Sequence, residues 1–189
     1  MMSAGRSCRY SPVEEGYVVV LSAFLDESGL HPETPVLSVG GFYGSEDQWK
    51  AFRQLWEPLS DRFHAKDSSR LFPDLCAAIE NSKVSGVLLT ISKETYKTCA
   101  SEHLKSYGGN AYAVCVFLCV KEICAQTNNA RVSFFLEQGQ PNLSFVKSTL
   151  EDAMDDGEWC VASVTSAQKS DFSNSTPLIF YLILQARMM

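Results

Sequence analysis

The chain has 189 residues, of which 46% are apolar and 20% are charged, and its formal net charge is −6. These values predict a globular protein with a substantial core, and the negative charge argues against holding nucleic acid by bulk electrostatic attraction. Because there is no window of about 18 consecutive apolar residues, we expect no membrane span. Residues 1–16 contain no apolar stretch, so we expect a poorly ordered tail rather than a secretory signal, one domain over 17–189 and a cytoplasmic location.

The first part of the domain predicts two strands and a helix. An apolar, β-branched run predicts a strand over residues 17–25, and a second run predicts a strand over 35–43, with Gly29 in the turn between them. Ser45 and Gln48 form a capping-box signature that opens a helix. The residues of this helix that should face the core are Trp49, Phe52, Trp56 and Leu59.

The rest of the chain predicts alternating helices and strands. In chain order these are a helix at about 73–81, a strand at 86–92, a helix at about 111–126, a strand at 131–136, a helix at about 143–154, a strand at 159–165 and a last helix in the tail from residue 177. This order predicts an α/β fold with a mixed central sheet flanked by helices.

Acidic residues stand where several of these elements end. Asp26 and Glu27 lie in FLDESG, Glu137 lies in FFLEQGQPN, FHAKD ends at an aspartate, and Asp171 in QKSDFSNS is a fourth candidate. Carboxylate oxygens are the ligands that hard cations such as Mg²⁺ and Mn²⁺ prefer. Carboxylates that meet at one edge of a sheet would form a cation site, and the cation could activate water and stabilise charge on a phosphoryl oxygen.

Each candidate also has an ordinary structural interpretation. Asp26 can accept hydrogen bonds from the backbone amides of Ser28 or Gly29 in a turn, Glu137 can end a strand at a tight turn, and Asp171 can cap a helix or lie in a loop. His64 alone is typical of a partly exposed helix end, but Lys66 two residues later suggests a base or a phosphate contact. The pattern therefore leaves turn cap and metal ligand equally open for the acidic pair in FLDESG.

The segments FLDESG, FHAKD, FFLEQGQPN and AQKSDFSNSTPL, in this order from Phe24 to Leu178, resemble the bacterial and phage "domain of unknown function 3800" family. That family is assigned to the ribonuclease-H-like superfamily by its fold. The resemblance implies a mixed sheet flanked by helices and a carboxylate-lined site for Mg²⁺ or Mn²⁺. It makes Asp26 the anchor acid on the first strand and places Glu27, His64 and Glu137 in or near the site. The family has no settled substrate, so a nuclease activity is an analogy with the fold.

The end of the chain departs from the family's pattern. The family usually carries PLQ-x-A-D here, a helix with a closing aspartate, whereas this chain reads PLIFYLILQARMM and has neither the glutamine nor the aspartate in residues 179–184. Either Asp171 substitutes, or the site lacks one ligand, or this end is truncated or frame-shifted. The apolar run IFYLIL also suggests a surface that pairs with a second copy or another protein.

Two functional hypotheses follow. In the first, the protein is a metal-dependent phosphodiesterase acting on RNA or DNA, in which Asp26 and Glu137 bind the cation and Glu27 or Asp171 completes its shell. In the second, it is a non-catalytic ribonuclease-H-like module that binds a protein partner or nucleic acid, as the missing aspartate and the negative charge suggest. A third interpretation, an α/β domain whose acids are all caps, also fits the sequence.

The segment FHAKD has a role only in the first hypothesis. His64 would assist proton transfer or orient a water molecule, and Lys66 would contact a phosphate of the substrate. Both residues stand in the most basic part of the chain.

Overall fold

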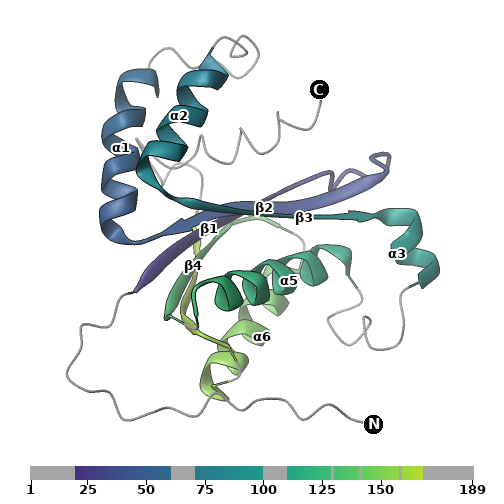
Figure 1. Ribbon diagram of the computed structural model, residues 1–189. Coiled ribbons are helices and arrows are strands. Elements are labelled where there is room, and N and C mark those ends of the chain that lie inside the picture. Colours follow the sequence, from purple (N-terminus) through teal and green to yellow (C-terminus); the bar gives the residue numbers. More distant parts are fainter. Residues whose placement is uncertain are drawn as a thin grey trace.

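The computed structural model describes residues 20–60, 71–99, 110–128, 130–140, 142–157 and 159–167. They form a mixed five-stranded sheet in the order β3-β2-β1-β4-β5 (Figure 1). The strands are β1 (Leu21–Ser28), β2 (Val36–Gly44), β3 (Ser85–Ser92), β4 (Val132–Glu137) and β5 (Val161–Ala167). β2 is antiparallel to both β1 and β3, whereas β4 is parallel to both β1 and β5.

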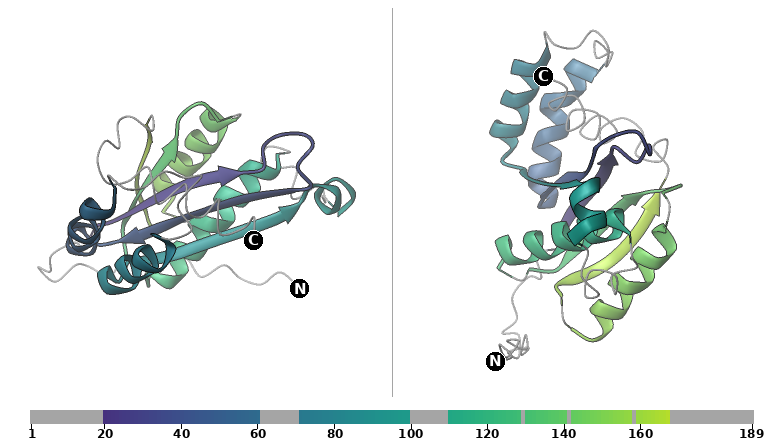
Figure 2. Two further views of the ribbon diagram at one scale, coloured as in Figure 1. Left: turned by 90° about the horizontal axis from the view of Figure 1, so that it is seen from above. Right: turned by 90° about the vertical axis from the view of Figure 1, so that its right-hand side faces the viewer.

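Helices cover both faces of the sheet (Figures 1 and 2). On one face lie α1 (Glu46–Ser60) and α2 (Phe72–Ser82), and on the other lie α5 (Ala111–Gln126) and α6 (Leu143–Asp155), while α3 (Lys93–Cys99) follows β3 directly. In the part of the chain that the structure describes, no helix is long and apolar enough to cross a membrane.

The alternation of side chains along the strands separates two apolar cores. Ala23, Leu25 and the apolar residues of β4 that share their face pack against α5, which is apolar around most of its circumference. Phe24 lies on the opposite face, where its ring meets Trp49 of α1 edge-on at a centroid distance of 4.9 Å and stacks on Phe135 at 4.7 Å. A residue's position in the strand therefore determines which helix layer it contacts.

The predicted elements between residues 35 and 167 are present with small shifts at their ends. The capping box is confirmed: the Ser45 amide donates to Gln48 Oε1 at 2.8 Å, and the Gln48 amide donates to Ser45 Oγ at 3.4 Å. The seven-residue helix α3, KETYKTC, was not predicted, because its polar sequence has no apolar periodicity. The predicted tail over residues 1–16 and the predicted last helix lie outside the described residues.

One boundary changes the interpretation of the acidic pair. The first strand was predicted to end at residue 25, but β1 continues to Ser28 because Asp26, Glu27 and Ser28 all pair with residues of β2. Asp26 and Glu27 are therefore strand residues, and the turn comes after them.

A candidate acidic metal site

The acidic residues lie at the carboxyl ends of β1, the central strand of the sheet, and its neighbour β4. β2 and β3 extend from one side of β1, and β4 and β5 extend from the other. Leu25 of β1 pairs with Leu136 of β4 in the parallel register, so Asp26 and Glu137 follow at the same edge. In open α/β sheets, a crevice at the carboxyl ends of the strands at such a switch in strand order is the usual place for a ligand.

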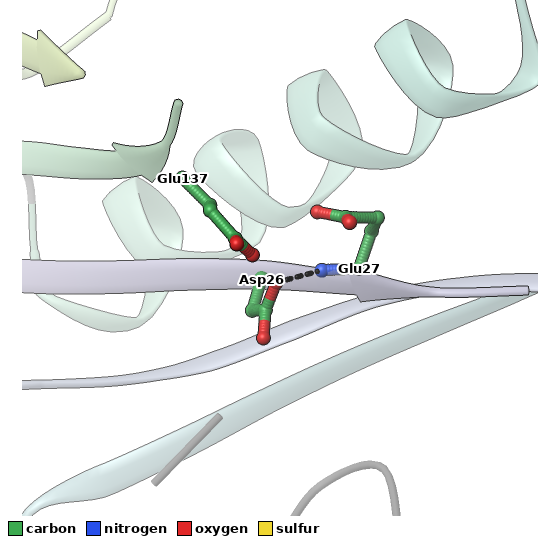
Figure 3. Close-up of side chains that lie close together, drawn as sticks. All are labelled: Asp26, Glu27 and Glu137. Atoms are coloured by element: carbon green, nitrogen blue, oxygen red, sulfur yellow. Dashed lines mark hydrogen bonds between the residues drawn. The ribbon is translucent and has the colours of Figure 1, made fainter. Parts of the chain in front are cut away.

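Three carboxylates meet at this edge. Asp26, Glu27 and Glu137 each contribute an oxygen atom to a set whose members all lie within 4.8 Å of one another. Figure 3 shows Glu137 reaching from the end of β4 toward Asp26, with Glu27 at the end of β1 beside them. Asp26 is buried, whereas Glu27 and Glu137 are half-buried.

Asp26 is held in an unusual environment for an acid. Its side chain is 6% exposed, and its Oδ1 accepts a hydrogen bond from the backbone amide of Glu27 at 2.8 Å. Its Oδ2 is buried and has no hydrogen-bond partner among the residues that the structure describes. Burial, then a hydrogen bond with Glu137, then the charges of Glu27 and Glu137 raise the pKa of Asp26 to about 9, against a smaller opposing effect of the amide bond.

Tyr112, in the first turn of α5, lies near enough to the three carboxylates for their charges to change its pKa. The side chain of Asn110 caps this helix by accepting a hydrogen bond from the backbone amide of Tyr112 at 2.8 Å, and Tyr112 is 3% exposed. Burial raises the pKa of the Tyr112 phenol, and the charges of Glu27, Asp26 and Glu137 add to that increase. Tyr112 was missed in the sequence because it has the pattern of an ordinary core residue in an apolar helix.

The donor set fits a hard divalent cation. All the ligand atoms are carboxylate oxygens, and Asp26 Oδ2 is a buried acceptor whose hydrogen-bonding capacity is unused by the described residues. A carboxyl group in this condition is costly to bury as an anion, and a cation would offset that cost directly. Mg²⁺ and Mn²⁺ are the ions whose preferences match such oxygen ligands.

The structure brings together three of the predicted site residues: Asp26, Glu27 and Glu137. The interpretation of Asp26 as a cap on the following turn is wrong, because its observed amide partner is Glu27 within the strand. The other predicted residues, His64, Lys66 and Asp171, lie outside the described residues. Their roles, and those of the three gathered acids, stay predictions.

Comparisons with known proteins identify the fold. No family model matches the chain, and no curated protein matches it. The structure of the PCNA:RNase HII complex from Archaeoglobus fulgidus is similar, with a TM-score of 0.50, 15% identity and coverage of 88% of this chain and 69% of that chain. The ribonuclease H2 from Pyrococcus horikoshii OT3 is similar, with a TM-score of 0.51, 12% identity and coverage of 89% and 72%. The fold is ribonuclease-H-like. The predicted α/β fold class is confirmed, and at these identities the likeness concerns the fold alone.

Proposed function

We propose that the protein is a divalent-metal-dependent phosphodiesterase acting on nucleic acid, as a member of the "domain of unknown function 3800" family. The observation that carries the proposal is the convergence of Asp26, Glu27 and Glu137 at the carboxyl ends of two adjacent parallel strands. The ribonuclease-H-like fold supports it, because both similar structures contain ribonucleases of this fold.

Each acid would have a distinct task in holding Mg²⁺ or Mn²⁺. Asp26 is oriented by the Glu27 amide and has a buried Oδ2 without a partner among the described residues, so it is the proposed anchor. Glu137 and Glu27 belong to the same oxygen set as Asp26, so both would share the cation. Once bound, the cation would activate water and stabilise charge on a phosphoryl oxygen. In the same proposal Asp171 completes the shell, His64 moves the proton of the attacking water, and Lys66 contacts phosphate.

The test is cleavage of labelled single-stranded, duplex and RNA–DNA hybrid substrates with Mn²⁺. Asp26→Asn is expected to reduce the rate at least about 100-fold, because it removes the buried anionic oxygen while nearly preserving shape. Asp152→Asn, at an exposed position of α6, is the matched control and should cleave at the wild-type rate. Equal background rates for wild type and Asp26→Asn would refute the proposal.

A non-catalytic module is the alternative, and the absence of an aspartate from residues 179–184 favours it. Calorimetric titration with Mn²⁺ separates the cases. Mn²⁺ binding that depends on Asp26 but accompanies no cleavage of any substrate would indicate a metal-binding module. The proposed partner or second copy on the apolar run 179–184 is tested by light scattering, and a monomer would count against it.

A further inference from the structure

A row of hydroxyl groups crosses three strands on the sheet face that carries Asp26. Ser28 of β1 pairs with Ser38 of β2, and Ser38 pairs with Thr90 of β3. Residues directly opposite one another in a sheet share a face, and so do residues two apart in one strand. Asp26 is two residues before Ser28, so the three hydroxyls lie on its face, one row away, at roughly 7 Å along the strand.

The row that contains Asp26 has a glycine in its middle. Asp26 pairs with Gly40, and Gly40 pairs with Leu88 of β3. Gly40 contributes no side chain between the acid and Leu88, whose side chain is 51% exposed. The α1–α2 layer packs on this face through Phe24 and Phe42, at the opposite end from the hydroxyl row. Asp26 and Gly40 are buried whereas Leu88 is exposed, so the solvent-facing end of this row lies on β3.

Ser38 is the residue of the row whose buried hydroxyl points to a ligand. Its side chain is 3% exposed, and its Oγ has no hydrogen-bond partner among the described residues. Most buried hydroxyls in proteins are hydrogen-bonded, because burying one without a partner costs free energy. Asp26 Oδ2 is in the same condition on the same face. The cation proposed at Asp26 would satisfy its Oδ2, which leaves Ser38 Oγ, one row away on the adjacent strand, as a donor for a group of the substrate.

We propose that Ser38 and Thr90 form a binding subsite for the sugar–phosphate backbone of a nucleic-acid strand, beside the phosphodiester held at the acidic cluster. This inference rests on the proposed function and adds the path of the substrate. Serine and threonine hydroxyls donate to phosphate oxygens, as they commonly do in nucleic-acid complexes. Their separation of roughly 7 Å from Asp26 along the strand keeps the bound phosphate away from the carboxylates.

The exposure of the row gives the path a direction. Thr90 is exposed, Ser38 is buried and Ser28 is half-buried. The strand would thus enter from the solvent over β3, with Leu88 as apolar surface for a sugar or base, and reach the acids of β1 past Ser38. Ser38 and Thr90 would be binding residues that set the Michaelis constant without touching the reacting atoms.

The experiment uses the full chain and fluorescein-labelled RNA and DNA oligonucleotides, with binding measured by anisotropy. Ser38→Ala and Thr90→Val remove one hydroxyl each with little change of shape. Each is expected to weaken oligonucleotide binding about threefold to tenfold, the effect of one lost hydrogen bond. In cleavage, KM should rise by the same factor while kcat and the calorimetric affinity for Mn²⁺ stay at wild-type values.

Ser163→Ala is the matched control. Ser163 is an exposed serine of β5, and its Oγ lies 2.9 Å from the Oγ of Ser133, a residue of β4 that comes four positions before Glu137. The Ser163→Ala variant should bind oligonucleotides as the wild type does. If Ser38→Ala does not fold, as judged by circular dichroism, Thr90→Val at its exposed position carries the test.

The outcomes separate this inference from the proposed function. Normal binding by the Ser38→Ala, Thr90→Val double variant, or an equal loss in Ser163→Ala, would overturn the subsite even if the wild type cleaves. If the wild type binds oligonucleotides without cleaving them, and the variants bind more weakly than the wild type, the subsite is supported and the phosphodiesterase activity is refuted. A wild type that binds no RNA or DNA oligonucleotide would overturn the subsite.

Discussion

The buried acid at the centre of the site should destabilise the protein when no cation is bound. The pKa of Asp26 is about 9 in the folded protein, against an ordinary value of 3.8. At a pH between these two pKa values, the Asp26 carboxyl group is protonated in the folded protein and ionised in the unfolded chain. The contribution of Asp26 to stability is therefore fully present below pH 3.8 and is lost progressively as pH rises toward 9.

The magnitude follows from the same pKa values. At pH 7 the solution is about three pH units above the pKa of the unfolded chain, and each unit corresponds to about 1.4 kcal/mol. Folding with Asp26 protonated then costs about 4 kcal/mol, an upper limit because the fold can relax and admit water. The amide introduced by Asp26→Asn has no proton to release in this pH range. This variant therefore avoids the cost and should be more stable than the wild type by up to that amount.

The assay is thermal or urea unfolding in EDTA at several pH values. Asp26→Asn should unfold up to about 10 °C higher than the wild type at pH 7, and the difference should shrink toward pH 4. Adding Mn²⁺ should raise the unfolding temperature of the wild type and leave that of Asp26→Asn unchanged. Asp152→Asn, at its exposed position on α6, should match the wild type under all these conditions.

One result would refute this reasoning. If Asp26→Asn were less stable than the wild type in EDTA at pH 7, interactions of the Asp26 carboxyl group that an amide cannot reproduce would outweigh the cost of burying the acid. Asp26 would then be a structural residue of β1, and the argument for a cation at its Oδ2 would fail.

Three further substitutions, two of them paired with a control substitution, test the fold by unfolding in urea. Gly41→Ala should destabilise by at least about 3 kcal/mol, because its Cβ would lie 1.8 Å from a backbone oxygen of β1, whereas Gly139→Ala meets nothing within 4 Å and should cost about 1 kcal/mol through its positive φ alone. Ser45→Ala should cost about 1 kcal/mol by removing the capping box of α1. Phe52→Ala should cost about 3–5 kcal/mol because Phe52 is fully buried, whereas Leu55→Ala, at a 40% exposed position of the same helix, should cost far less. Equal losses within either matched pair would contradict the packing described for it.

Local patterns in the sequence were enough to predict most of the elements. The apolar runs of β1 and β2, the capping box at Ser45 and the long apolar run of α5 each predicted an element at about the observed place. These signals are local, because strand alternation and helix capping depend on residues only a few positions apart. The same reasoning misplaced the end of β1, which pairing with β2 extends, and missed α3, whose sequence is polar.

By itself, then, the sequence determined the α/β class and the acids that end its strands. Only the tertiary structure decided that β4 lies beside β1, which brings Glu137 to Asp26 across more than a hundred residues of chain. It also decided that Asp26 and Ser38 are buried on one face, each with an oxygen that has no partner among the described residues. The physical reason is that periodicity assigns a residue to a face of its strand, whereas strand order and register come from packing between distant segments.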